Sequence, residues 1–287
     1  MEVTINFFIK LLIINHFIII YNTQIIVQAN YNSIDTHSLY CDDQINFYGT
    51  SNLNVYKIID EENKININSQ LIMNIYDGPN PLHHLCTKNI HFKTTSNNEK
   101  ILLEFNNPNN LLGLFKNSSA IYIEIKSGNF DNYQDFSFFF SYSLYLKSIN
   151  ITKFNFKNAK SINAIFHYCS NLEEIIWPTN MNSPLLISAQ AVFYGCSKLI
   201  SIDISNFNFS NVIIMFGFFA DCLNLEKIIF PKNISSIEDV SGMFYNCKKL
   251  TSIDLSNFEF SNIYNMTNLF NGCINLTKII WPEKILI

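Results

Sequence analysis

The chain contains no arginine, since all 19 of its Lys+Arg residues are lysines. Arginine makes the bidentate contacts to phosphate that nucleic-acid-binding surfaces use, so its absence argues against a nucleic-acid partner. Glycine is also scarce, with 8 residues among 287, and the formal net charge is only -4. We therefore expect neither a glycine-rich phosphate loop nor a strongly charged ligand.

Sequence motifs for catalysis are missing as well. The chain has no G-x-G-x-x-G, no G-K-[ST], no H-E-x-x-H and no G-x-S-x-G. One cluster looks like metal ligands, formed by His83, His84, Cys86 and His91, but its spacing matches no zinc signature and favours a polar loop. We predict a protein that is not an enzyme, with no cofactor, no metal and no catalytic residue.

The first 29 residues have the features of a signal peptide. Lys10 precedes an apolar run over residues 11–20, and Val27-Gln28-Ala29 is a small-residue cleavage pattern. Cleavage after Ala29 would leave a mature chain that is secreted or displayed at the cell surface. An uncleaved membrane anchor and a merely apolar terminus are the alternatives. No later segment reaches the roughly 20 apolar residues that span a bilayer.

A repeat dominates the second half of the chain. Five cysteines recur at steps of 27, 26, 25 and 26 residues: Cys169, Cys196, Cys222, Cys247 and Cys273. Leucine follows each cysteine by three residues, isoleucine follows by six, and another apolar residue follows by eight. This L-x-x-I-x-apolar pattern is close to the core of leucine-rich repeats, and its final alternation predicts a short strand.

A different period precedes each cysteine. Ile162, Ile165, Phe166 and Cys169 stand at i, i+3, i+4 and i+7, and the other units keep nearly the same spacing. Such spacing is typical of one face of a helix of about two turns. Each unit is therefore predicted to be a short helix, a turn and a short strand.

The array extends upstream and alternates between two kinds of unit. Ser143 takes the place of the cysteine 26 residues before Cys169, and a degenerate unit covers residues 111–125. Three units run into Ile-Ile-Trp-Pro or Ile-Ile-Phe-Pro, and the units between them run into Ser-Ile-Asp. The true period is thus a pair of units.

The segment Ser241–Phe258, SGMFYNCKKLTSIDLSNF, resembles the repeat of BspA-type leucine-rich repeat surface proteins, also grouped as a mycoplasma-type repeat of unknown function. The resemblance covers about residues 100–287. It implies a surface or secreted location and a role in adhesion or recognition, and it brings no catalytic residues with it. The expected fold class is an α/β solenoid, a leucine-rich repeat array with a parallel sheet on one face and short helices on the other.

Three segments are expected along the chain. After the signal peptide, residues 30–98 lack the repeat but contain alternating apolar runs and turn signals, which predicts a small β-rich N-terminal cap. Such a cap would cover the apolar end of the solenoid. The array of units of about 26 residues then fills residues 99–287. Because it stops just past a strand without a closing sequence, we expect a truncated C-terminus or an end covered by another molecule.

The repeat cysteines have two interpretations. They are either buried free thiols that act as small apolar groups, or disulfide partners in an oxidising compartment. Ser143 in the same slot favours free thiols, because a serine needs no partner. Cys41 and Cys86 lie outside the array and are a candidate disulfide, which the sequence neither supports nor excludes.

The outward side chains of the strands are the candidate binding surface. One row, in which apolar and acidic residues alternate, comprises Ile176, Asp203, Ile229, Asp254 and Ile280. Exposed isoleucines at regular intervals are unusual on a structural face, so we propose a protein-binding row. The alternative is that the row only reflects the two-unit period. Recurring Phe-x-Phe pairs, such as Phe207 and Phe209, favour a buried aromatic spine over sugar stacking.

We accordingly expect a surface or secreted protein of recognition or adhesion that binds an unknown protein or cell-surface ligand, or a glycan, through its sheet face. The alternative is the ectodomain of a larger membrane-anchored receptor or structural surface protein. N-glycosylation sequons, in the number that chance predicts, suggest modification at Asn117, Asn150, Asn208, Asn233 and Asn275. A sixth, at Asn265, adjoins an apolar stripe and is not expected to be modified.

Overall fold

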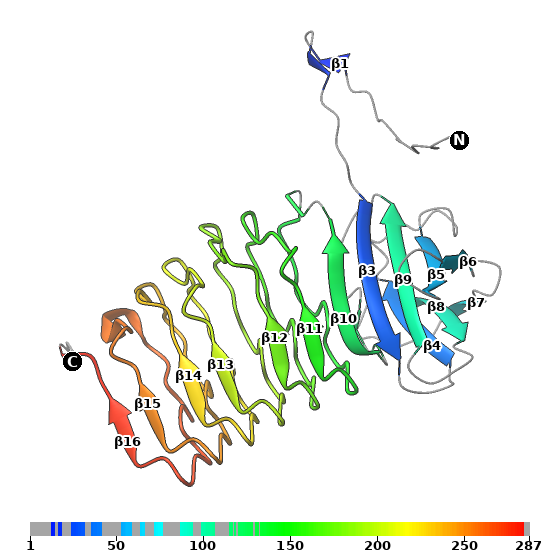
Figure 1. Ribbon diagram of the computed structural model, residues 1–287. Helices are drawn as coiled ribbons and strands as arrows, with labels where there is room; N and C mark the ends of the chain where they lie inside the picture. The colour runs from blue at the N-terminus through cyan, green and yellow to red at the C-terminus, as the bar shows by residue number, and fades with distance from the viewer. Residues whose placement is uncertain are drawn as a thin grey trace.

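The computed structural model describes residues 115–283, except 117, 119, 129 and 132, and the strands that precede them within residues 13–106. The early strands are β1 (Ile13–Ile14), β2 (Phe17–Ile18), β3 (Gln24–Tyr31), β4 (Thr36–Cys41), β5 (Leu53–Ile58), β6 (Lys64–Asn66), β7 (Ile72–Tyr76), β8 (Thr87–Lys93) and β9 (Glu99–Asn106). Strands β3 to β9 pair antiparallel at one end of the molecule, as Figure 1 shows.

The sheet changes character at β10 (Ala120–Ser127). This strand pairs antiparallel with β3 on one side and parallel with β11 on the other, so it joins the N-terminal strands to the array. Six strands of three residues follow: β11 (Ser148–Asn150), β12 (Glu174–Ile176), β13 (Ser201–Asp203), β14 (Lys227–Ile229), β15 (Ser252–Asp254) and β16 (Lys278–Ile280). They lie along one side of a row of stacked coils (Figure 1). The array is a parallel β-solenoid of six coils.

The predicted helices before the cysteines are wrong. Those stretches are successive turns, and among the described residues the helical structure is a single 3-10 turn, η3 (Phe260–Asn262). In the coil of Cys169, the N–H of Ile165 donates to the carbonyl of Ile162, and the N–H of Cys169 donates to that of Phe166. Ala164 and Tyr168, the third residues of these two turns, have φ of 54° and 55°, as type II turns require. We call this part of each coil the turn ribbon.

The turns replace a helix because the neighbouring coil takes half of the backbone hydrogen bonds. The N–H groups of Ile162, Ala164, Phe166 and Tyr168 donate across to the carbonyls of Ser188, Gln190, Val192 and Tyr194. In an α-helix these N–H groups would point along the helix axis and bond within the helix, so they could not donate to the carbonyls of the next coil. Two consecutive four-residue turns also space apolar side chains four apart, which explains why the sequence resembles a helix.

Aromatic rings fill the interior beneath the turn ribbon. Phe115 and one phenylalanine from each of the six coils form a stack, with ring centroids 5.3–6.0 Å apart and interplanar angles of 5–20°. The stacked rings are Phe115, Phe140, Phe166, Phe193, Phe219, Phe244 and Phe270. The Phe-x-Phe pair of Phe207 and Phe209 is also buried in this core, as the interpretation of an aromatic spine predicted. Burial of so many rings is the main stabilising contribution of the array.

Backbone pairing between neighbouring coils is more continuous on the turn ribbon than on the strand side. On the turn ribbon, parallel bridges cross every coil boundary from Asp135 to Asn265. On the strand side, β10, β11 and β12 pair in succession within the seven-stranded sheet, whereas β13 with β14 and β15 with β16 form two separate ladders. The other two boundaries are bridged after the strands, by Met181 with Phe207 and by Ile234 with Phe258. The two-unit period of the sequence is therefore also a two-coil period of the hydrogen bonding.

Strand β3 includes the point where signal cleavage is predicted. Ala29 pairs with Ile101 of β9 and with Ile123 of β10. Cleavage after Ala29 would thus divide a strand in the middle of the seven-stranded sheet, so the cleavage stays a prediction that N-terminal sequencing decides. Within the part of the chain that the structure describes, no helix has the length and apolar character needed to cross a bilayer.

Candidate functional site

The outward face of the strands carries the predicted row. The middle residue of each three-residue strand points into the core, and the flanking residues point outward. The register aligns Asn150 with Ile176, Asp203 with Ile229, and Asp254 with Ile280. All five predicted residues therefore lie on one face, at the third position of successive strands. We call Ile176, Asp203, Ile229, Asp254 and Ile280 the sheet-face row.

The isoleucines of this row are accessible to a partner. Ile176, Ile229 and Ile280 expose 41%, 40% and 41% of their surface, although each stands on a well-formed strand. These nearly equal values mean that the three coils present the same apolar group in the same way. The exposed part of each isoleucine contributes no burial to the fold, so the recurrence of this apolar surface on alternate coils favours contact with a partner.

The aspartates of the row do have a structural role. Asp203 Oδ1 accepts a hydrogen bond from the N–H of Ser205 at 2.9 Å, and Asp254 does the same with Ser256. These Asx turns direct the chain away from the strand. Hydrogen bonds from the side chain and backbone of Ser205 hold the pKa of Asp203 below its ordinary value.

Proline explains why acidic residues and isoleucines alternate. Two residues after Ile176, Ile229 and Ile280 stand prolines, Pro178, Pro231 and Pro282. Proline has no N–H, so an aspartate at the third strand position of those coils would have no turn to make. The structure thus explains aspartate in the coils without this proline. It gives no structural reason for isoleucine in the coils with proline, which favours a functional role for these isoleucines.

The first strand position forms a second outward row with more charge. In the three coils with a proline after the strand, this position holds Glu174, Lys227 and Lys278. In the other coils it holds Ser148, Ser201 and Ser252. Lys227 and Lys278 each lie close enough to an aspartate of the sheet-face row to help lower its pKa. The face is therefore apolar and of mixed charge toward the C-terminal coils.

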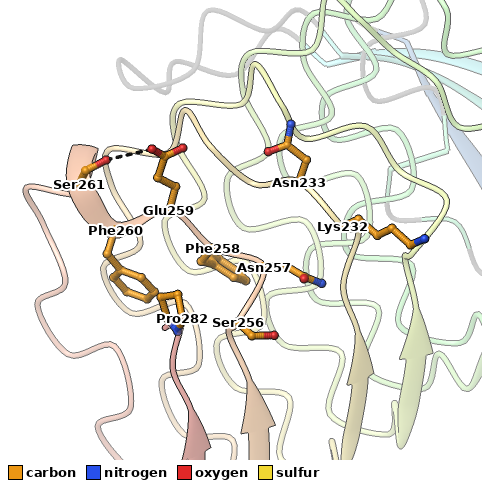
Figure 2. A pocket seen from close by; sticks show the side chains of 9 residues that line it. All are labelled: Lys232, Asn233, Ser256, Asn257, Phe258, Glu259, Phe260, Ser261 and Pro282. Atoms are coloured by element: carbon orange, nitrogen blue, oxygen red, sulfur yellow. Dashed lines mark hydrogen bonds between the residues drawn. The ribbon is translucent and has the colours of Figure 1, made fainter. Parts of the chain in front are cut away.

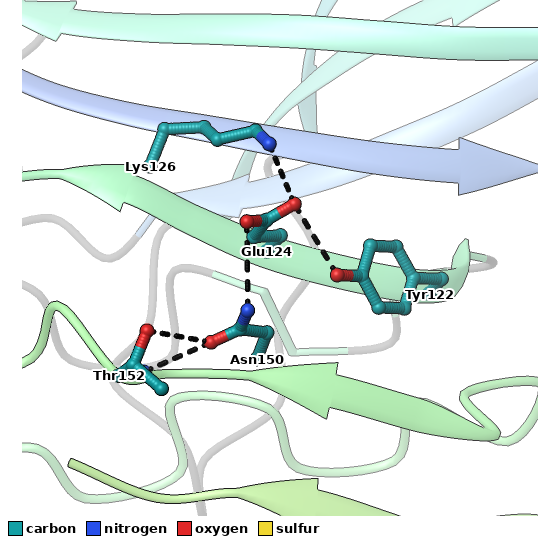
Figure 3. A network of polar contacts seen from close by, with 5 residues as sticks. All are labelled: Tyr122, Glu124, Lys126, Asn150 and Thr152. Carbon is teal, nitrogen blue, oxygen red and sulfur yellow. Dashed lines mark hydrogen bonds and ion pairs between the residues drawn. The ribbon is translucent and has the colours of Figure 1, made fainter. Parts of the chain in front are cut away.

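The N-terminal end of the same face is a closed polar network, shown in Figure 3. Glu124 accepts a hydrogen bond from the Tyr122 hydroxyl at 3.2 Å and forms an ion pair with Lys126 at 2.7 Å. Asn150 donates to Glu124 and accepts from the backbone and hydroxyl of Thr152. Because these groups satisfy one another, this end is less suited to a ligand than the isoleucine coils.

The repeat cysteines are free and structural. Four are buried and Cys273 is half-buried. Each thiol donates to the carbonyl of a stacked phenylalanine in the preceding coil, as Cys196 Sγ does to Phe166 at 3.2 Å. Ser143 Oγ makes the same bond to Phe115 at 2.8 Å. Burial raises the pKa of Cys169 to about 12, so such thiols stay protonated.

The remaining predicted sites are only partly described. Cys86, His83, His84 and Asn117 lie outside the described residues, so the candidate disulfide with Cys41 stays a prediction. The amides of the sequons at Asn150, Asn208 and Asn275 donate hydrogen bonds to other residues of the array. Asn233 is exposed and, unlike the other three, its side chain makes no hydrogen bond to any described residue.

Sequence reasoning missed two hollows at the corner that follows the strands. One, of about 720 Å³, lies between the segment Ser205–Ser210 and Pro231. The other, of about 380 Å³, lies between the segment Ser256–Ser261 and Pro282 (Figure 2). Lys232, Asn233 and Asn257 line both. The recurring Pro-x-Asn sequence could have indicated these hollows. Proline has no N–H, so it cannot donate a backbone hydrogen bond to the coil before it.

Comparison with known proteins places the repeat in a family. The family described as Mycoplasma protein of unknown function, DUF285, matches residues 88–185 and again residues 179–281. No curated protein and no solved structure matches the chain. The two matches follow one another along the array and together cover more than half of the sequence. The chain therefore belongs to the DUF285 family of Mycoplasma proteins of unknown function.

Proposed function

We propose that this protein is a non-enzymatic recognition or adhesion protein, displayed at the cell surface or secreted, that binds a protein ligand through the sheet-face row. The observation that carries the proposal is the equal exposure of Ile176, Ile229 and Ile280 on alternate coils. A solenoid offers such a row as an extended surface, because every coil adds the same positions at a regular interval.

Two further features support the proposal. The neighbouring row adds Lys227 and Lys278, so a partner would meet apolar groups next to charges of both signs, a composition suited to a protein surface. A small hollow of about 170 Å³ lies between β14 and β15, with Ile280 and Asp254 at its edge. It offers a place for one anchoring side chain of the partner.

The test is a triple substitution, Ile176→Ser, Ile229→Ser and Ile280→Ser. The tagged wild-type chain and the variant are incubated with intact cells of candidate types, and bound chain is measured by fluorescence. We expect binding to fall at least tenfold, since each isoleucine contributes on the order of 1 kcal/mol of buried apolar contact. The melting temperature should change little, because the three side chains are outside the core.

A matched control is available on the same molecule. Ile187, Ile200 and Ile213 expose 48%, 57% and 38% of their surface but belong to none of the strands. Their triple change to serine likewise removes three isoleucine side chains and at least as much exposed apolar surface. If both triple variants bind cells equally well, or if both lose binding equally, the sheet-face row is not the ligand surface.

We also propose that the coils are of the BspA leucine-rich type. Support comes from the leucine of the repeat, which is buried at Leu172, Leu199 and Leu225, and from the repeated family match. A surface or secreted location is part of the same proposal. N-terminal sequencing of chain recovered from the culture medium tests it, and a start at Asn30 is the expected result.

A further inference from the structure

We propose that the two hollows at the corner after the strands form one continuous groove that binds a neutral oligosaccharide. The groove borders the sheet-face row at Ile229, which lines its larger part, but all its other lining residues follow the strands, and Ile176 does not line it. Its two parts share Lys232, Asn233 and Asn257, and their volumes of about 720 Å³ and 380 Å³ are in the range of ligand sites.

The first argument is the chemistry of the lining. Amides and hydroxyls are as frequent in it as apolar side chains, and they include Ser205, Asn208 and Ser256 in addition to the shared asparagines. Such groups both donate and accept hydrogen bonds, as the hydroxyls of a sugar do. The only charged side chains are Lys232 and Glu259, which balance each other and favour a ligand without net charge.

The second argument is an apolar surface beside these polar groups. Phe260 is half-buried and lies next to Pro282, as Figure 2 shows, while Phe258 is almost completely covered. A sugar ring has an apolar C–H face, which packs on an aromatic or proline surface while its hydroxyls reach the amides at the rim. The partly exposed Phe260 is the residue placed for that contact.

The third argument concerns two asparagine side chains in the groove. They make no hydrogen bond to any described residue, whereas the corresponding asparagines of the preceding two-coil period do. Asn206 donates to the carbonyl of Pro178 at 3.0 Å, and Asn180 accepts from the N–H of Asn182 at 2.9 Å. Asn257 and Asn233 occupy the corresponding places one period later, and their side chains make no hydrogen bond to any described residue. Hydrogen-bonding capacity that the fold uses elsewhere is thus free at the groove.

The fourth argument is repetition. One hollow follows the segment Ser205–Ser210 and the next follows the segment Ser256–Ser261, a two-coil period further along. A ligand that is itself a chain of similar units would contact both parts. A longer oligosaccharide should therefore bind more tightly than a disaccharide of the same sugar.

The experiment uses the full chain produced in a bacterial host, so that Asn233 carries no glycan. Chitotetraose, cellotetraose and maltotetraose are the probes, and isothermal titration calorimetry is the measurement. We expect at least one of them to bind, and its disaccharide to bind more weakly. Asn257→Ala and Asn233→Ala should each weaken binding about fivefold, as expected for one lost hydrogen bond. Neither change removes a side-chain hydrogen bond to a described residue, so the melting temperature should be unchanged.

The variant Ile176→Ser separates this groove from the sheet-face row, because it should leave oligosaccharide binding unaltered. Absence of binding for all three neutral probes at millimolar concentration would overturn the proposal. So would binding that survives Asn257→Ala and Asn233→Ala but is lost with Ile176→Ser. Tighter binding of anionic tetragalacturonate than of any neutral probe would show that the ligand class is wrong.

Discussion

The turn ribbon and the strand side of this solenoid are built from the same coils but are held together differently. On the turn ribbon, hydrogen bonds cross every coil boundary, and the stacked phenylalanines and thiols lie directly beneath. On the strand side, the ladder is interrupted between β12 and β13 and between β14 and β15, and proline opens the corner that follows. The comparison indicates that one side carries the stability of the array, while the other side is free to vary its surface.

The largest effect expected from this comparison is at the stacked rings. Phe193 is fully buried between Phe166 and Phe219. Phe193→Ala should lower the free energy of unfolding by about 3–5 kcal/mol, because it leaves a cavity in the core. Urea denaturation measures the change. The control on the strand side, Ile229→Ser, should cost less than about 0.5 kcal/mol. Equal losses would mean that the two sides contribute alike.

A second test concerns the positive φ angles of the turn ribbon. Gly195 and Gly242 both have positive φ, so alanine at either should cost about 1–2 kcal/mol. A Cβ at Gly195 would also lie 2.6 Å from Cδ1 of Tyr168, whereas one at Gly242 would make an ordinary contact, 3.8 Å from Cβ of Tyr245. Gly195→Ala should therefore be the more destabilising, as measured by urea denaturation. Adding Tyr168→Ala should recover part of the loss, and no recovery would contradict the packing described.

Cysteine reactivity compares the interior coils of the turn ribbon with the coil that contains Cys273. Burial raises the pKa of Cys169, Cys196 and Cys222, which keeps these thiols protonated and unreactive. Interaction with the neighbouring Cys247 side chain lowers the pKa of Cys273, which is only half-buried. Iodoacetamide at pH 8 should therefore modify Cys273 first, as peptide mass spectrometry would show. Modification of Cys196 at a similar rate would contradict the tight packing of the interior coils.

The smallest effect is a pH dependence on the strand side. Hydrogen bonds from Ser205 and Ser256 lower the pKa values of Asp203 and Asp254 in the folded chain. A lowered pKa contributes stability above the unfolded value of about 3.9, and this contribution is lost as the pH falls through the folded value. Asp203→Asn keeps the turn acceptor and removes the titration.

Thermal melts from pH 6 down to pH 2 measure this effect. Because Asp203 is exposed, the difference from wild type at pH 6 should be slight, and the variant should lose less stability in acid. A variant that loses as much stability as the wild type between pH 5 and pH 2 would show that the turn does not depend on the charge of Asp203.

Some of the fold follows directly from the sequence. Cysteines in register with Leu and Ile define the length of the coil, and the period-two ending at residues such as Ile202 places the strand. Alternation of Asp203 with Ile229 gives the two-coil period and the outward row. These features depend on local spacing and on which side chains are apolar, and both can be read from one chain without its neighbours.

The tertiary structure alone decided the rest. Apolar spacing before Cys169 fits a helix and a pair of turns equally well, and most of the positive φ positions, such as Tyr168, carry side chains rather than glycine. The turns prevail because the next coil accepts the N–H groups of Ala164 and Phe166. Those hydrogen bonds exist only when the coils stack. The corner groove also depends on stacking. Pro231 lacks the N–H that would donate to the preceding coil, and this matters only when that coil lies beside it.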